Sequence, residues 1–116
     1  MDDIDIPILK KTYELYKAFH EHRKAVAKED RFTIYERSEN LIIDIVELLL
    51  AAGYMRSGDK TSLLEQASVN LNTLRFFVRL MKDTKAIDLK KYTALQSMID
   101  EIGRMLGGWI RSNGSR

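Results

Sequence analysis

The fold of this chain is decided by residues 62–82, which read SLLEQASVNLNTLRFFVRLMK. Apolar residues recur in this stretch at steps of three and four, which is the spacing of one face of an α-helix. The expected core face consists of Leu64, Ala67, Leu71, Leu74, Val78 and Met81. The stretch therefore predicts a long amphipathic helix.

Three further segments show the same period, at about residues 7–27, 33–52 and 88–111. Their expected core residues are Leu9, Tyr13, Tyr16, Phe19 and Val26 in the first, Ile34, Ser38, Leu41, Ile45, Leu48 and Ala52 in the second, and Tyr92, Leu95, Ile99, Ile102, Leu106 and Trp109 in the last. Strand-like alternation is absent, so the sequence predicts an all-α protein with four helices.

The connections between these segments are short. Residues 28–31 form a charged turn, residues 53–60 a loop punctuated by glycine, and residues 83–87 a polar link followed by Asp88 as the expected N-cap. Short links favour antiparallel neighbours, so we expect an up-down antiparallel four-helix bundle. At 116 residues with 45% hydrophobic composition, residues 1–116 fit one domain.

Composition also limits the compartment and the chemistry. The chain has no cysteine, which excludes disulfides and thiolate metal sites. The first residues include Asp2, Asp3 and Asp5 in place of a basic leader, and the longest apolar run, residues 48–53, is too short to span a bilayer. We expect a soluble cytoplasmic protein with no membrane partner.

Catalytic and metal-binding patterns are not found. His20 and His22 lie two residues apart, so on a helix they diverge and cannot chelate one ion; we interpret them as surface histidines. Glu36, Glu39, Asp44 and Glu47 are interpreted as charges on a solvated helix face, the alternative being an acidic patch for a basic partner. No phosphate-binding glycine loop or nucleophile motif occurs. We therefore expect a protein that is not an enzyme and has neither a metal nor a cofactor.

The basic residues are the candidates for binding. The formal net charge is only +2, but residues 60–116 hold ten basic and five acidic side chains. Arg75, Arg79 and Lys82 share one helical edge, a spacing that suits a phosphate backbone or an acidic protein groove. The alternative is local pairing, because Asp83 lies four residues after Arg79.

Two further arginines belong to the same prediction. Arg104 and Arg111 align on the outward face of the last helix, with Asp100 as a competing partner for Arg104. All five basic side chains are candidates for contacts with nucleic acid or a protein.

A second apolar stripe lies on the back of the helix at 62–82. Val69, Thr73, Phe76 and Leu80 are about 200° to 260° around the helix from the core stripe. We expect Val69, Phe76 and Leu80 to form a subunit interface, the alternative being scattered exposed apolar residues. Gly103 and Gly107, one turn apart, would let a neighbouring helix approach closely.

Two stretches resemble a known family. They are Leu74-Arg75-Phe76 with Arg79, and the run at 101–110, Glu-Ile-Gly-Arg-Met-Leu-Gly-Gly-Trp-Ile. Over about residues 63–111 the chain is similar to the third and fourth helices of the accessory variability determinant (Avd) proteins of diversity-generating retroelements. The resemblance implies a homopentameric barrel of four-helix bundles. It also implies a non-catalytic role, with a basic surface binding the error-prone reverse transcriptase and its template RNA or cDNA.

A related family shares the predicted architecture. It comprises the four-helix proteins encoded within intervening sequences of 23S ribosomal RNA genes. Membership there would imply a structural oligomer with protein partners only, and the arginines would then serve ion pairs. The salt dependence of RNA binding separates the two interpretations.

Overall fold

The computed structural model of the chain describes residues 7–55 and 57–114, with the backbone alone for residues 57–59 and 114. It contains four long helices and, within the described residues, no strand. The long helices are α1 (Pro7–His22), α3 (Glu36–Tyr54), α4 (Ser57–Asp83) and α5 (Leu89–Gly114). The all-α prediction is confirmed.

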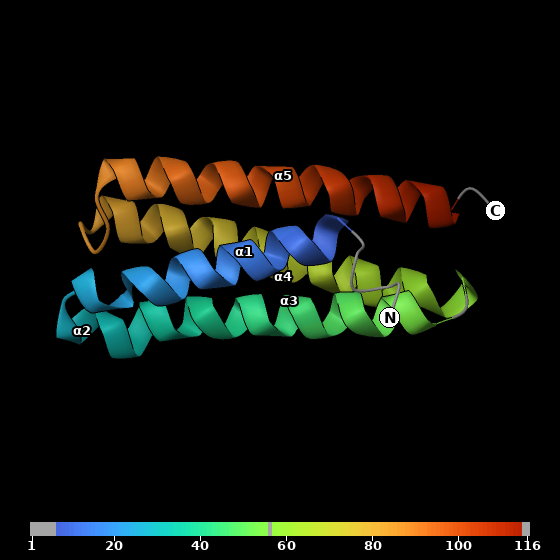
Figure 1. Cartoon of the computed structure of the whole chain (residues 1–116), viewed down its shortest axis with the longest axis horizontal. Coiled ribbons are helices and arrows are strands. Elements are labelled where there is room, and N and C mark those ends of the chain that lie inside the picture. The colour runs from blue at the N-terminus through green and yellow to red at the C-terminus, as the bar shows by residue number, and fades with distance from the viewer. Residues whose placement is uncertain (1–6, 56, 115–116) are drawn as a thin grey trace.

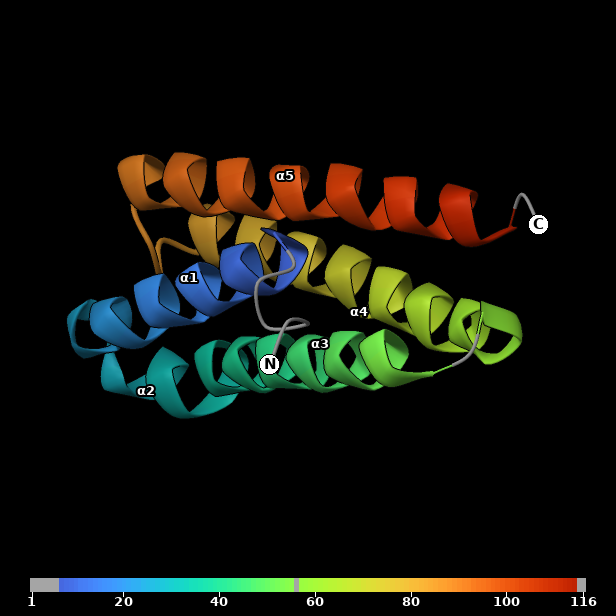
Figure 2. The same ribbon diagram turned by 45° about the vertical axis from the view of Figure 1, so that its right-hand side comes forward.

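The four helices run alternately in opposite directions, as Figures 1 and 2 show. Helix α1 packs on α3 and α5, and α4 packs on the same two helices, so α1 and α4 occupy opposite corners. The bundle measures 46 × 25 × 21 Å. This arrangement is the predicted up-down antiparallel bundle. Among the described helices, none combines the length and the apolarity that a bilayer span requires.

The connection from α1 to α3 differs from the predicted charged turn. It comprises a 3₁₀ turn, η2 (Arg23–Ala25), a single helical turn, α2 (Lys28–Asp30), and a π-helical segment, η3 (Arg31–Tyr35), which continues into α3. The helical path therefore starts at Lys28 and not at Thr33. The break falls at Val26, which is extended and buried in the core.

The link between α3 and α4 is shorter than the loop predicted at 53–60. Helix α3 continues through Gly53 to Tyr54, and α4 starts at Ser57. Glycine lowers helix propensity by only about 1 kcal/mol, which packing of the two long helices readily offsets.

The predicted core of α4 is confirmed, since all six of its stripe residues are buried. In α5 the four central residues of the predicted stripe are buried, whereas Tyr92 and Trp109 are partly buried against the core. In α3 the buried residues are Ser38, Glu39, Ile42, Ile45, Leu49 and Ala52, and Tyr35 of η3 precedes them in the core. The predicted Ile34, Leu41 and Leu48 lie at its flank, because this helix is apolar on several faces and periodicity alone does not choose among them.

The core face of α1 is also rotated from the prediction. The predicted Leu9, Phe19 and Val26 are buried, but Ile8 and Leu15 are buried as well, whereas the predicted Tyr13 is 64% exposed. Thr12 lies in the core, where its hydroxyl donates to the carbonyls of Ile8 and Leu9 at 3.1 and 3.0 Å. A threonine can occupy the core because its hydroxyl is hydrogen-bonded to the backbone of its own helix. Because threonine is polar, the apolar periodicity of the sequence did not assign position 12 to the core face.

Candidate nucleic-acid interface

Arg75 bridges α4 and α5. Its Nη2 lies 3.3 Å from Oδ1 of Asp100, and its Nη1 donates to Oδ1 of Asn72 at 2.6 Å. A Cβ on Gly103 would come within 3.1 Å of the Arg75 guanidinium. The room expected at Gly103 for a neighbouring helix is thus used by an arginine side chain. Arg75 meets a carboxylate here, so its charge is partly neutralised.

Arg79 and Lys82 share one carboxylate. Nε of Arg79 lies 3.3 Å from Oδ2 of Asp83, and Nζ of Lys82 lies 3.2 Å from Oδ1. The hydrogen bond from Lys82 and the positive charges of both side chains lower the pKa of Asp83. Lys82 also lies 5.0 Å from the ring centre of Tyr92. The local pairing weighed for Arg79 is therefore present, with one positive charge in excess.

Arg104 and Arg111 are exposed on α5. Asp100 pairs with Arg75, so the competition expected for Arg104 does not arise. Among the described side chains, no carboxylate lies at ion-pair distance from either arginine. Both remain candidates for contact with an anionic partner.

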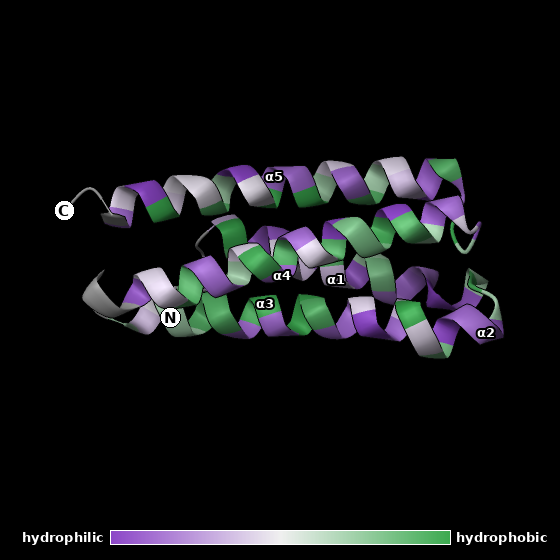
Figure 3. Cartoon of the chain, turned by 180° about the vertical axis from the view of Figure 1, so that it is seen from behind, coloured by the Kyte–Doolittle hydropathy of each residue, from purple (hydrophilic) through white to green (hydrophobic). Residues whose placement is uncertain are grey.

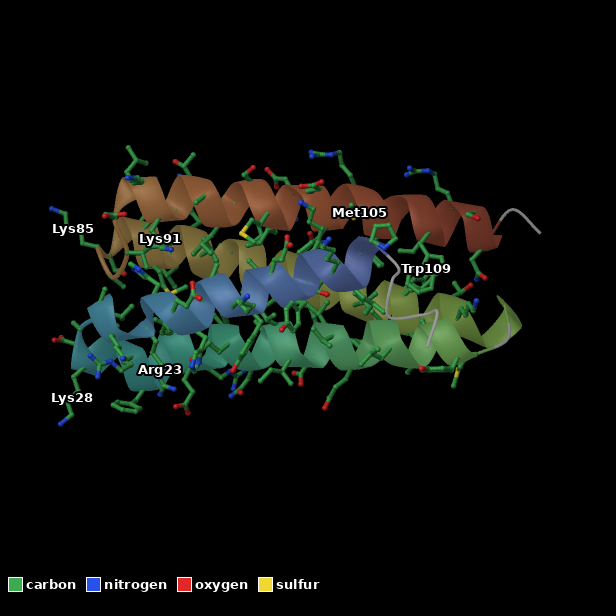
Figure 4. The ribbon with its side chains drawn as sticks, in the orientation of Figure 1. Arg23, Lys28, Lys85, Lys91, Met105 and Trp109 are labelled. Atoms are coloured by element: carbon green, nitrogen blue, oxygen red, sulfur yellow. The ribbon has the colours of Figure 1, made fainter. Side chains whose placement is uncertain are left out.

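The fold gathers further basic residues at one end of the bundle. Residues 23–31 and residues 82–91 each contain four basic and two acidic side chains, giving a net charge of +4. Figure 4 shows Arg23 and Lys28 from the first segment near the same end as Lys85 and Lys91 from the second. We call these two segments the basic end. The up-down topology implied their proximity, but charge counted along the chain concealed it.

The backbone of the basic end is held by hydrogen bonds. The guanidinium of Arg31 donates to the carbonyl of Val26 at 3.0 Å and to that of Lys24 at 3.3 Å, which closes the first turn. Lys85 adopts a left-handed conformation with φ of 67° at the end of α4. Left-handed backbone is unusual for a residue other than glycine. The buried Ala86 and Ile87 that follow anchor the second turn.

Five lysines of the basic end keep their charges available. They are Lys24, Lys28, Lys85, Lys90 and Lys91, and none forms an ion pair with a described side chain. Burial lowers the pKa of the partly buried His22, and the positive charge of Lys91 lowers it further, with Asp88 acting in the opposite direction. His22 is therefore neutral at pH 7. The described part of the molecule thus presents a group of unpaired ammonium groups at one end.

Arg23, unlike the five lysines, contacts two carboxylates and an aromatic ring. It lies 3.5 Å from Glu36 and 3.8 Å from Glu39, with its guanidinium 5.3 Å from the ring centre of Phe32. Glu39 is buried and His20 lies 3.9 Å from it, so Glu39 is not the solvated charge that the sequence predicted. Side chains of α1 and η2 cover it. Within the described residues, no three histidine or acidic side chains are grouped to hold a metal ion.

The predicted interface residues lie on the outer face of α4. Val69, Phe76 and Leu80 are 57%, 66% and 40% exposed. We call them the outer stripe. Figure 3, which views the chain from behind, shows hydrophobic bands along α4. The stripe is thus uncovered in the single chain, and its role as an interface stays a prediction.

Comparison with known proteins assigns the family. Among curated proteins, none matches this chain. The model of one protein family, described as bAvd-like, matches residues 6–113, which include the four long helices except the last residue of α5, the basic end and the outer stripe. Because this match extends over nearly the whole chain, the protein belongs to the bAvd-like family.

Proposed function

We propose that this protein is a non-catalytic accessory subunit of a diversity-generating retroelement and acts in the cytoplasm. In this proposal it binds the error-prone reverse transcriptase together with the template RNA or its cDNA. The polymerase performs the mutagenic copying, and the accessory subunit organises enzyme and template. Membership of the bAvd-like family supports the assignment to a retroelement.

The five unpaired lysines of the basic end carry the nucleic-acid part of the proposal. Lysines that neutralise phosphates release condensed counterions, so binding that depends on them weakens steeply with salt. Lys28 and Lys85 approach from different connections and are both exposed. A phosphate backbone crossing this end of the bundle could meet both. Arg104 and Arg111 extend the candidate surface to α5, and Arg75, Arg79 and Lys82 remain candidates along its edge with α4.

The decisive experiment measures binding of a structured RNA over a salt series. We expect Lys28→Gln with Lys85→Gln to weaken binding and to reduce the slope of log K against log salt by roughly 1.5, the value for two lost phosphate contacts. The matched control is Lys17→Gln with Lys60→Gln, which removes the same charge from lysines of α1 and α4 that lie outside the basic end. This control should leave most of the slope intact.

Two results would contradict the proposal. Equal slope changes in the two double variants would show that the RNA responds to net charge and not to the basic end. A wild-type protein without RNA affinity near physiological salt would favour a structural oligomer with protein partners only. Co-purification with the reverse transcriptase of the same retroelement tests the second partner, and Arg104→Gln with Arg111→Gln tests whether α5 contributes to either contact.

The proposal includes assembly as a homopentamer. The exposed outer stripe supports self-association, because a single bundle leaves these apolar residues in water. Light scattering tests this part independently of RNA, with a mass near five chains as the expected result.

A further inference from the structure

The outer side of the α1–α3 pair carries an open apolar groove of about 770 Å³. It is lined by Leu9, Tyr13, Tyr16, Ile43, Val46 and Leu50. Tyr13 and Ile43 are exposed, so the groove opens to solvent. Its volume is within the range of pockets that enclose several apolar groups. Leu9 is buried in the core, and Tyr16 and Leu50 pack against the core, so the floor of the groove belongs to the bundle. The exposed Tyr13 and Ile43 are apolar surface that the core does not use.

The outer stripe of α4 is apolar, like the lining of the groove. Phe76, the most exposed of its residues, lies between Val69 and Leu80. The two arginines within this stretch are drawn aside, Arg75 toward Asp100 and Arg79 toward Asp83. The stripe therefore presents apolar groups without an intervening charge.

The groove and the stripe of one chain cannot cover each other. Helix α4 lies diagonally across the bundle from α1, and its outer stripe faces away from the core. Two copies that pack stripe against stripe would leave both grooves open. Packing the stripe of one copy into the groove of another buries both kinds of surface in one contact.

We propose that the outer stripe docks in the α1–α3 groove of a second copy of this chain, with Phe76 as the central anchor. The inference rests on the self-association proposed above and identifies the two surfaces that make it. Aromatic anchors in apolar pockets commonly dominate interfaces of this kind. Because the two surfaces differ, the contact is head-to-tail, and its repetition closes a ring when the rotation permits.

Charged residues of both signs border the groove and the outer stripe, as expected for a contact between the two surfaces. Lys10 and Glu47 lie at the edge of the groove, and neither is in an ion pair with a described side chain. Glu65 and Arg79, of opposite charge, flank the stripe on α4. An apolar centre with a charged rim is the usual anatomy of a protein interface.

A mixing experiment tests the docking. Phe76→Asp destroys the stripe and keeps the groove, and Ile43→Asp destroys the groove and keeps the stripe. Each variant alone should have the light-scattering mass of one chain at concentrations where the wild type is assembled. An equimolar mixture should have the mass of two chains and no more, because only one of the possible contacts remains intact. Leu89→Asp, a change at an exposed apolar residue outside both surfaces, is the matched control and should keep the wild-type mass.

Several outcomes would overturn the inference. They are an Ile43→Asp variant that stays assembled, a mixture that stays monomeric although circular dichroism shows both variants folded, and a wild type that is monomeric. RNA titrations separate this inference from the proposed function. A protein that binds RNA and keeps its mass in both variants contradicts the docking alone. A protein that assembles as expected and ignores RNA contradicts the RNA-binding proposal alone.

Discussion

At the scale of single residues, Tyr35 links α1 to η3, the segment that continues into α3. It is fully buried, its ring lies 4.9 Å from that of Phe19, and its hydroxyl donates to the carbonyl of Phe19 at 2.6 Å. We expect Tyr35→Phe to lower the free energy of unfolding by about 1–2 kcal/mol, because the ring packing remains while one buried hydrogen bond is lost. Urea unfolding measures this change, and a variant as stable as the wild type would show that the hydrogen bond contributes little.

Tyr35 also predicts a response to alkaline pH. Burial raises the pKa of its hydroxyl above the ordinary value near 10, Glu39 raises it further, and Arg23 opposes the shift. Because the folded state holds the proton more tightly than the unfolded state, this stabilisation is complete below about pH 10 and declines as pH rises above it. The wild type should therefore lose stability more steeply between about pH 10 and 12 than Tyr35→Phe. Parallel curves for the two proteins would contradict the assignment.

At the scale of helices, Asp88 determines where α5 begins. The sequence predicted it as the N-cap, and the prediction is confirmed: its Oδ1 accepts a hydrogen bond from the backbone N–H of Lys91 at 2.7 Å. Asp88→Ala should cost about 1 kcal/mol of folding stability, whereas Asp88→Asn, which keeps a side-chain acceptor, should cost much less. Equal losses in the two variants, measured by urea unfolding, would argue against capping.

Gly53 of α3 and Gly103 of α5 should respond differently to substitution by alanine. A Cβ at Gly53 would meet no atom within 4 Å, so Gly53→Ala should raise stability by about 0.5–1 kcal/mol. At Gly103 the added carbon would approach the Arg75 guanidinium at 3.1 Å, and the side chain must move away from its place beside Asp100. Gly103→Ala should therefore gain less stability than Gly53→Ala. Thermal unfolding of both variants tests the order.

At the scale of the whole molecule, self-association couples stability to concentration. If folded chains assemble and unfolded chains do not, mass action raises the unfolding temperature as protein concentration increases. We expect this dependence in the wild type and its loss in Phe76→Asp, whose substitution lies on a residue that is 66% exposed and outside the core. Scanning calorimetry over a hundredfold range of concentration measures it. A wild-type midpoint independent of concentration would argue against assembly.

The sequence predicted the buried face of some helices better than that of others. In α4 the core stripe continues without interruption along the helix, and every residue of that stripe is buried as expected. In α3 neighbouring isoleucines and leucines form two possible core stripes one residue apart. The packing of α3 against α1 and against α4 buries Ile42 and Leu49 and leaves Leu41 and Leu48 at the flank. Tyr13 was assigned to the core of α1 because it fits a helical step, yet it borders the groove.

The sequence by itself determined the helical class, the up-down order of four helices, the cap of α5, the exposed stripe on α4 and the resemblance that the family match confirms. These properties depend on local spacing, which the chain carries at every position. Only the tertiary structure decided the basic end, the α1–α3 groove and the pairing of Arg75 with Asp100. Each of these brings together residues from separate helices or connections, and their proximity depends on how each helix is rotated in the bundle. That rotation is set by the packing of all four helices at once, which no single stretch of sequence contains.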